Sequence, residues 1–405
     1  MEANPEQLLT EPPLPGGSAE SRSIYNSAFW TLCLSSLFFF ASFNMIIPEL
    51  PSYLTSLGGG DYKGLIISLF TLTALISRPF SGTLADRIGR KPIIMAGSMV
   101  CFVCSLLYPL LSTVYGFFLL RLLHGFSTGF TPTGQAAYLS DVIPADRRGE
   151  AMGLLGTAGT LGMAGGPALG GWLSSSFSVQ AMFYVSSGLA ICSSLMVVAI
   201  RETMHNKHPV SMKLLKIQKS DFLEPRVLAP CIVMALGAYA YGTLFTIIPD
   251  FGAHVGIQNK GLLFTYFTVA SLLIRLIAGR TSDTYGRVTV LKFSTLLMTM
   301  SMLWISYADT QLLLIIGVFL YGLAQGATSP TLLAWATDLS DPLRKGRGVA
   351  SLYIFMEFGI GMGALLSGII FGNQAERIYL TFLISGGLSA IAFLYLIARR
   401  TPVAI

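Results

Sequence analysis

The chain has 405 residues, of which 53% are apolar and only 11% are charged, and its net charge is +6. A soluble globular domain carries about 25% charged residues, so a soluble fold of this sequence would expose apolar surface that water solvates poorly. The basic residues lie between long apolar runs rather than in one patch. This arrangement argues against a nucleic-acid surface and favours a protein that crosses a membrane several times.

In chain order, the first segment is an acidic tail over residues 1–26, which is rich in Pro and Gly and is expected to be disordered. It lacks the basic start and the cleavage site of a signal peptide. Each apolar run that follows is long enough to cross a bilayer, which takes about 20 residues. The runs predict about twelve spanning helices, near 27–48, 63–82, 93–112, 115–139, 150–173, 179–200, 227–249, 261–280, 289–308, 311–336, 347–371 and 377–398.

A basic connection over residues 201–226 divides these spans into two equal sets. We therefore expect an all-α membrane protein with an N-terminal six-helix bundle over 27–200, a C-terminal six-helix bundle over 227–398 and a short tail over 399–405. Lys and Arg gather in the loops on one side, and loops rich in these residues face the cytoplasm. The expected orientation places the central loop and both termini in the cytoplasm.

The two halves repeat each other at a shift of 197 residues, which aligns LISRPFSGTLADRIGR (75–90) with LLIRLIAGRTSDTYGR (272–287). Charges shared by both halves more often serve the fold or the gate, so Arg78 and Arg275 are expected to be structural or gating residues, with substrate binding as the alternative. Parallel repeats of this kind place a substrate site between the halves, near the midplane. Further matches in the same register are Asp86 with Asp283, Arg90 with Arg287, and Asp141 with Asp338.

The segment GTLADRIGRKP (82–92) follows the second span, and a weaker copy, GRTSDTYGR (279–287), follows the eighth. Glycine permits a close helix approach at position 82 and a tight turn at position 89. The chain from about residue 27 to residue 400 resembles the major facilitator superfamily, whose signature loop is G-x-L-a-D-R-x-G-R-K. This resemblance implies two pseudo-symmetric six-helix bundles and transport by alternating access.

The resemblance also implies that this loop is a charge latch, which keeps the outward-facing state closed on the inside. Anchoring at the membrane interface is the alternative reading. A carboxylate at Asp86 can accept from helix N-terminal amides or pair with an Arg, and Asp141 is a candidate partner for Arg87 or Arg90. The candidate latch residues are Gly82, Asp86, Arg87, Gly89, Arg90, Asp141, Asp283, Arg287 and Asp338.

The fifth span contains GMAGGPALGG (162–171), whose small residues predict a flat face for close helix packing. Pro167 removes an internal hydrogen bond and is expected to bend the helix. The segment resembles the G-x-x-x-G-P-x-x-G-G signature of the drug:proton antiporter branch, which implies an exporter. The candidate packing residues are Gly162, Gly166, Pro167, Gly170 and Gly171.

The fourth span contains RLLHGFSTG (121–129), which resembles the R-x-x-Q-G-x-x-x-G element of that branch, with His124 where Gln is usual. Arg121 lies about six residues into the span, roughly 9 Å deep. An Arg at that depth is expected to face the cavity and to have a partner, unless it snorkels to the surface. His124 is either a hydrogen-bonded core residue or a carrier of protons.

Glu357, in the eleventh span, is the only acidic residue expected deep in the membrane, roughly 15 Å along its helix. Desolvation at that depth favours the protonated form, so Glu357 is the leading proton-coupling candidate and His124 the second. A permanently protonated Glu357 that only donates a hydrogen bond is the alternative. The candidate cavity residues are Arg121, Asn44, Tyr241, Tyr353 and Met356.

These features predict a secondary active transporter and no enzyme. The first interpretation is proton-coupled export of small amphipathic, drug-like molecules across a bacterial inner membrane; the alternative is export of a specific physiological solute, such as a sugar or a metal-chelating metabolite. A receptor of the same fold that does not transport is a third hypothesis, but it needs neither Arg121 nor Glu357 in the membrane. Substrate, protons and the lipid bilayer are the expected partners of a monomer that takes its energy from the proton gradient and uses no cofactor, metal or nucleic acid.

Overall fold

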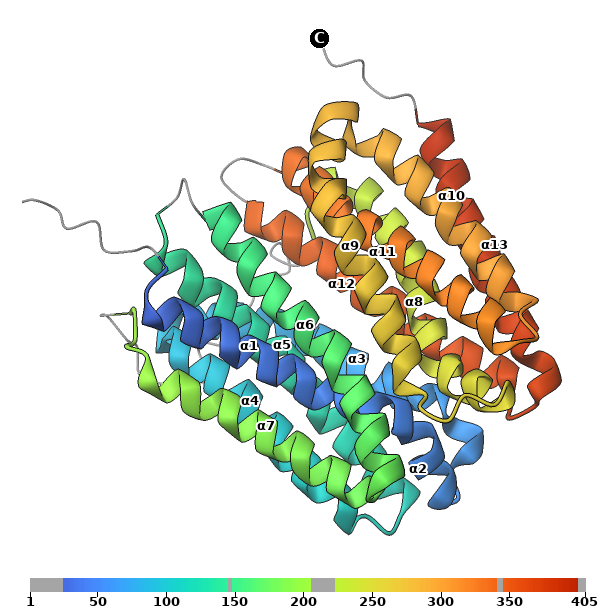
Figure 1. Cartoon of the computed structure of the whole chain (residues 1–405). Helices are drawn as coiled ribbons and strands as arrows, with labels where there is room; N and C mark the ends of the chain where they lie inside the picture. Colours follow the sequence, from blue (N-terminus) through green and yellow to red (C-terminus); the bar gives the residue numbers. More distant parts are fainter. Residues whose placement is uncertain (1–24, 145–147, 205–222, 341–344, 400–405) are drawn as a thin grey trace, which may run out of the picture.

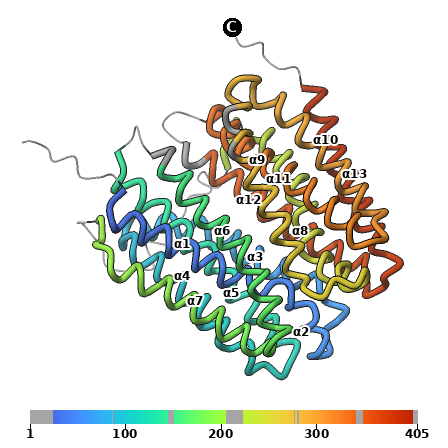
Figure 2. The backbone as a smooth tube through the Cα atoms, viewed as in Figure 1, coloured from blue at the N-terminus to red at the C-terminus, as the bar shows by residue number. Residues whose placement is uncertain are grey.

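A computed structural model describes residues 25–144, 148–204, 223–340 and 345–399. The described part of the chain contains twelve α-helices of 18 to 29 residues, joined by short turns (Figures 1 and 2). These helices are α1 (Ser27–Ile46), α3 (Gly64–Ile88), α4 (Arg90–Leu107), α5 (Val114–Val142), α6 (Arg148–Ser176), α7 (Val179–Ala199), α8 (Leu228–His254), α9 (Gly261–Tyr285), α10 (Arg287–Ser306), α11 (Gln311–Leu339), α12 (Lys345–Phe371) and α13 (Ile378–Ala398).

The chain does not stop at the end of α1. Pro48 lies in a short 3-10 turn, η2 (Ile47–Glu49), and a further short helix, α2 (Leu50–Ser56), follows it. The loop expected at 82–92 is also mostly helical, since α3 runs to Ile88 and α4 begins at Arg90. Only Gly89 makes the turn, with φ +114°, and Gly286 makes the equivalent turn between α9 and α10 with φ +87°. A positive φ is open to glycine at little cost.

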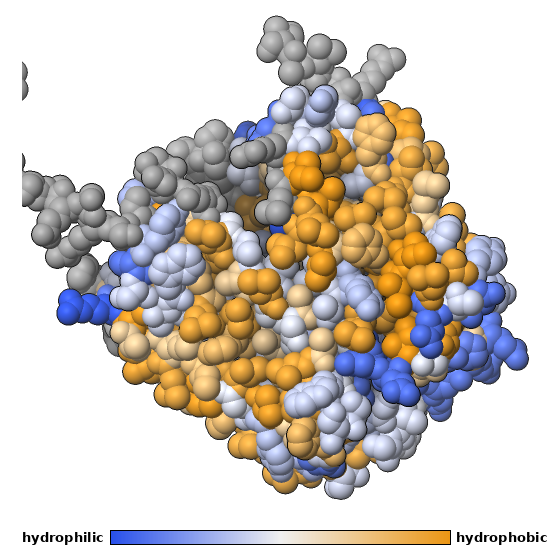
Figure 3. Space-filling view, viewed as in Figure 1, coloured by the Kyte–Doolittle hydropathy of each residue, from blue (hydrophilic) through white to orange (hydrophobic). Residues whose placement is uncertain are grey.

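Nine helices within the described ranges, some with adjoining turns, are long and apolar enough to cross a membrane. The other three long helices are α5, α6 and α9. Large apolar side chains such as Trp30, Leu195 and Ile277 are more than half exposed. Figure 3 shows apolar residues over much of the visible face and hydrophilic residues mainly near the helix ends. This surface suits a lipid environment and identifies an integral, multi-pass membrane protein.

Helices α1 to α7 pack against one another in one half, and α8 to α13 pack in the other (Figure 1). Between the halves, α3 packs against α12 and α6 packs against α9. We call the end that holds Ser27 and Ala398 the terminal face, and the end that holds Lys63 and Lys260 the opposite face. The two halves lie close together at the opposite face and farther apart toward the terminal face.

Glycine contacts close the two halves against each other at the opposite face. The start of α3 lies so near α12 that a Cβ atom on Gly64 would be 2.8 Å from the Ala364 carbonyl oxygen, and a Cβ atom on Gly368 would collide with Gly64. At the equivalent place in the repeat, a Cβ atom on Gly261 of α9 would collide with the Pro167 carbonyl of α6. Both contacts place backbone against backbone, which only glycine allows.

An ion pair adds to this closure. Lys63 Nζ lies 2.6 Å from Asp250 Oδ1 of α8 and 5.4 Å from the centre of the Phe371 ring. Lys260 Nζ donates to Ser52 Oγ at 2.8 Å, again from one half to the other. The opposite face is therefore sealed by charge as well as by packing.

Candidate functional site

A cavity of about 850 Å³ lies between the two halves. Its walls come from α1, α3, α5 and α6 in the first half and from α8 and α12 in the second. Helices α9 and α11 contribute none of its described lining residues. The lining extends from Ile67 and Phe245 deep between the halves to Gly82, Arg87 and Val349 near the terminal face. The closure at the opposite face leaves the terminal face as the side of access.

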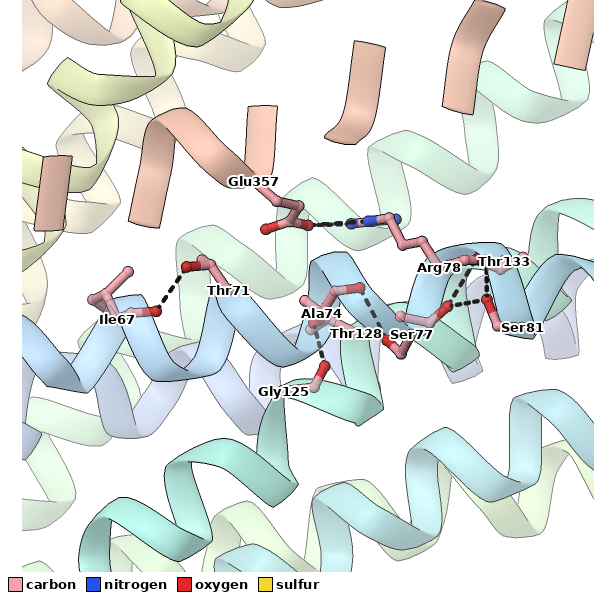
Figure 4. Close-up of polar contacts among 11 residues, drawn as sticks. Ile67, Thr71, Ala74, Ser77, Arg78, Ser81, Gly125, Thr128, Thr133 and Glu357 are labelled. Carbon is pink, nitrogen blue, oxygen red and sulfur yellow. Dashed lines mark hydrogen bonds and ion pairs between the residues drawn. The ribbon is translucent and has the colours of Figure 1, made fainter. Parts of the chain in front are cut away.

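Arg78 of α3 and Glu357 of α12 form an ion pair across this cavity (Figure 4). Both Arg78 Nη2 and Arg78 Nε donate to Glu357 Oε1, at 2.6 and 3.1 Å. The guanidinium also lies 5.1 Å from the centre of the Tyr353 ring. The Glu357 side chain is only 6% exposed, so each charge depends on the other for compensation.

The packing of α3 against α5 directs Arg78 into the cavity. Ser77 and Ser81 face α5, where a Cβ atom on Gly129 would collide with Ser77 and where Ser81 Oγ donates to the Gly129 carbonyl at 2.6 Å. Arg78, next to Ser77 on the helix, faces α12 instead. The sequence predicted a structural or gating role for Arg78 and did not identify it as the partner of Glu357. The sequence did hold a signal for this pair. An acidic residue deep in a membrane is energetically costly unless a cation lies beside it, so Glu357 called for a basic partner.

Arg121 also lines the cavity but is only 2% exposed. Its Nε donates to the Ile66 carbonyl at 2.7 Å, its Nη1 donates to Tyr108 Oη at 3.5 Å, and its guanidinium lies 4.6 Å from the centre of the Phe70 ring. It does not snorkel to the surface. No acidic side chain pairs with it in the described part of the chain, so its positive charge is not compensated.

Two other candidates lie away from the cavity. His124 is fully buried, with Nε2 3.2 Å from Cys101 Sγ and with no partner for Nδ1, and it is absent from the cavity lining. The structure therefore does not bring His124 and Glu357 together. Met356 packs in an apolar cluster of the second half with Met234 and Leu352, so its expected place in the cavity wall is wrong.

Aromatic rings from both halves form the deeper cavity wall. Phe43 and Phe70 stack with ring centres 5.9 Å apart in the first half, and Tyr241 and Phe245 stack at 4.1 Å in the second. Asn44 also lines the cavity, and its side-chain amide donates to the Phe40 carbonyl at 2.8 Å. The site thus combines an apolar aromatic pocket with one ion pair, a combination typical of sites for small organic molecules.

The candidate latch residues form the same pair in each half. Arg90 Nε lies 2.9 Å from Asp141 Oδ2, and Arg287 Nε lies 3.0 Å from Asp338 Oδ2. Arg287 also pairs with Asp283. All three pairs lie within one half, so none of them joins the halves in this conformation. The role of these residues as a latch stays a prediction.

Of the other latch candidates near the terminal face, two line the cavity. Gly82 lines the cavity and a Cβ atom there would meet nothing within 4 Å; Arg87 also lines the cavity. The side chain of Asp86 lies outside the described part of the structure. One neighbouring residue was missed from sequence: Glu202, whose carboxylate accepts from the Arg90 and Lys91 amides at 3.0 and 3.2 Å and so caps the start of α4.

The glycines of the fifth span pack mainly against α1. A Cβ atom on Gly166 would lie 2.6 Å from the Ala41 carbonyl oxygen, and Cβ atoms on Gly162 and Gly170 would collide with α1 backbone one turn to either side. Gly171 instead meets Asn259, and Pro167 meets Gly261. Gly165, which was expected on the same face, is exposed and touches nothing. The motif therefore joins two helices within the first half and also contacts the second half at the opposite face.

Within the described residues, no group of three His, Cys, Asp or Glu side chains is placed to hold a metal ion.

A family profile and the similar proteins of known sequence point to the same family. The sequence profile of the Major Facilitator Superfamily matches residues 32–260 and 231–404. The chain is 27% identical over 380 residues to the multidrug resistance protein MdtG of Escherichia coli, in strains O17:K52:H18 and K12 among others, which covers 89% of this chain and 92% of that protein.

Solved structures with the same fold include the peptide transporter POT in complex with sulfate, with a TM-score of 0.77 and 14% identity over 92% of this chain and 94% of that chain. The human organic anion transporter MFSD10 has a TM-score of 0.71 and 19% identity over 91% of this chain and 98% of that chain. The D-xylose–proton symporter has a TM-score of 0.75 and 13% identity over 91% of this chain and 96% of that chain. At such identities the likeness shows the fold alone.

Proposed function

The chain belongs to the major facilitator superfamily, and from this premise we propose that it exports small amphipathic organic molecules from the cytoplasm in exchange for protons. It is a secondary transporter that spans the membrane several times. Its relation to MdtG, a protein named for multidrug resistance, and the Pro-Gly motif at 162–171 support export. The energy source in this proposal is the proton gradient, and the working unit is the monomer.

The observation that carries the proposal is the ion pair between Arg78 and Glu357 inside the cavity. The two residues belong to different halves, so rocking of the halves, which slides α3 against α12, must strain or release the pair. A deprotonated Glu357 holds Arg78 by charge-assisted hydrogen bonds, whereas a protonated Glu357 offers only a weaker neutral one. Glu357 thus links its protonation to the movement of the halves.

This pair acts as a lock on the empty transporter. Without substrate or proton, the charges stay paired and the halves stay in the conformation described here. Either a proton on Glu357 or a substrate that takes the place of a partner opens the lock. An exchanger needs this property, because an empty carrier that switches freely dissipates the gradient.

The orientation follows from the distribution of Lys and Arg. In this proposal the terminal face is cytoplasmic and the membrane is the bacterial inner membrane. The cavity, closed at the opposite face by the Lys63–Asp250 pair, is then open to the cytoplasm, where an exporter collects its substrate.

The test is transport by purified protein in proteoliposomes with an imposed pH gradient, screened against dyes, sugars and metal chelators. We expect gradient-driven accumulation of amphipathic dyes on the acidic side. Accumulation of dyes that does not change when the pH gradient is collapsed would argue against proton exchange. Gradient-driven transport of sugars or chelators alone would replace the proposed substrate class by a single physiological solute.

A further inference from the structure

We infer that the substrate is a zwitterion with a flat aromatic body, held with its acidic group on Arg78 and its basic group on Glu357. This inference rests on the proposed function only in taking the cavity between the halves as the substrate site. It goes further by naming the charges that the substrate carries and the atoms that receive them.

The argument begins with the cost of opening the ion pair. An anion that draws Arg78 away leaves Glu357 as a buried charge without a partner, and a cation that draws Glu357 away does the same to Arg78. Removal of one partner from a buried pair costs more than the replacement of both. A substrate with adjacent acidic and basic groups replaces both partners at once, so neither charge is left alone.

The second step is the net charge of the substrate. Arg121 lies over Phe70, two helical turns and about 12 Å along α3 from Arg78. Its uncompensated charge makes the inner part of the cavity positive, which attracts an acidic group and repels a free cation. A purely cationic substrate therefore meets Arg78 and Arg121 together, opposed by Glu357 alone. A zwitterion keeps a balanced charge while it gains from both Arg78 and Glu357.

The third step is the body of the substrate. The stacked pairs Phe43–Phe70 and Tyr241–Phe245 come from different halves and line the same cavity. Flat rings gain most from such walls, through offset stacking or edge contacts. Tyr353, 5.1 Å from the Arg78 guanidinium, adds a ring beside the polar end. The cavity therefore accepts a ring system at its deeper end and a charged head at the ion pair.

This binding mode also explains how substrate could be exchanged for a proton at Glu357. An ammonium group binds more strongly to Glu357 as a carboxylate than to a protonated, neutral Glu357, so a proton and the substrate compete for this side chain. The positively charged group that pairs with this carboxylate is Arg78 on α3, and Tyr241 on α8 lies close enough to interact with both Glu357 and Arg275. Arginine and tyrosine keep their charge state near neutral pH, so neither adds an exchangeable proton to this site.

The experiment compares four compounds with the same ring at about pH 7, where ammonium and carboxylate groups are both charged. They are 2-naphthylalanine, which is a zwitterion, 3-(2-naphthyl)propanoate, 2-(2-naphthyl)ethylamine and the neutral 3-(2-naphthyl)propanamide. Equilibrium dialysis against the purified full chain in lipid nanodiscs measures each dissociation constant. We expect the zwitterion to bind about tenfold or more tightly than each of the other three, since each loses at least one charged hydrogen bond.

Variants assign the two charges. The Glu357→Gln variant should bind the zwitterion only as tightly as the unmodified protein binds the propanoate. The Arg78→Gln variant should bind the zwitterion only as tightly as the unmodified protein binds the ethylamine. Arg275→Gln is the matched control, because it removes the same charge at the equivalent position of the second half, outside the cavity lining, and should leave the order of the four affinities unchanged. Retained binding of the propanoate by Glu357→Gln shows that this variant is folded.

The inference is overturned if the propanoate, the amine or the amide binds as tightly as the zwitterion, or if none of the four binds. These outcomes are independent of the proposed function, which fails on transport: a protein that moves no compound in response to a pH gradient is not a proton-coupled exporter, whichever of the four it binds. Conversely, gradient-driven efflux of cationic dyes together with weak binding of the zwitterion keeps the exporter and removes the zwitterion.

Discussion

Arg78 and Arg275 occupy equivalent positions in the two halves, yet in the described part of the chain only Arg78 faces a carboxylate. Arg275 Nη1 of α9 donates to Thr160 Oγ1 of α6 at 3.4 Å, and Thr160 is the residue that the repeat aligns with Glu357. Each half therefore directs an arginine at the equivalent position of the partner half. That position is Thr160 in the first half and Glu357 in the second, and of the two only Glu357 is acidic. Among the described lining residues, this difference places an acidic group on one side of the cavity only.

The first prediction concerns the energy of the Arg78–Glu357 pair. Arg78→Gln or Glu357→Gln alone leaves one buried charge without a partner and should destabilise the protein by about 1 to 3 kcal/mol. The double variant removes both charges and should recover part of that loss. Thermal unfolding in detergent measures the four proteins. A double variant that is as unstable as the sum of the two single variants would show that the pair is not coupled.

The second prediction concerns Arg121, whose planar guanidinium donates to the Ile66 carbonyl and to Tyr108 while it stacks on Phe70. Lys cannot reproduce this fork and stacking, so Arg121→Lys should keep expression but lose most transport. Arg121→Gln should lose all of it. Vesicle efflux normalised to the amount of folded protein is the readout. Full activity of the Lys variant would mean that only the charge matters.

The third prediction concerns the seal at the opposite face. Lys63 reaches Asp250 across the halves, and the second carboxylate oxygen of Asp250 is buried without a partner. Asp250→Asn should weaken this seal by about 1 kcal/mol, a change of roughly fivefold in the ratio of the two conformations.

Single cysteines test this shift through their reaction with a membrane-impermeant thiol reagent. Thr133→Cys, in the cavity wall toward the terminal face, should become less reactive from that side in the Asp250→Asn background. Asp309→Asn, an exposed acid that follows α10, serves as the matched control. An equal reaction rate in the presence and absence of Asp250→Asn would remove the pair from the seal.

The sequence was sufficient for the fold because the repeat and the apolar runs are local signals. The expected span at 179–200 became α7 (Val179–Ala199), and the span at 377–398 became α13 (Ile378–Ala398). Asp141 could be named as a candidate for contact with Arg90 because it lies at the expected inner end of the fourth span. The structure sets these two side chains together, as it does Asp338 and Arg287 in the second half.

The site was harder to predict from the sequence than the fold, because it depends on contacts between residues far apart in the chain. Glu357 was identified by its depth alone, whereas its partner 279 positions away was not. His124 was expected near the chemistry because it follows Arg121 by one turn, and Met356 was expected there as one of several aromatic and Met side chains of the spans around the cavity. On a helix, however, residues within one turn cover all directions, and the packing of α5 and α12 turns these two side chains away from the cavity.

The last prediction concerns the proton itself. If Glu357 exchanges a proton for substrate, acidification in binding experiments should weaken the affinity for substrate, because a protonated, neutral carboxyl accepts a weaker hydrogen bond from the substrate than a carboxylate does. Glu357→Gln mimics the protonated side chain in size and hydrogen bonding but cannot titrate, so its weaker affinity should not depend on pH.

In proteoliposomes this variant should still equilibrate substrate across the membrane but fail to concentrate it, and substrate addition should release no protons. Thr160→Val, which changes the equivalent position of the first half, keeps Glu357 and should retain the pH dependence. Uphill transport by Glu357→Gln at the wild-type rate would show that the exchangeable proton is carried elsewhere.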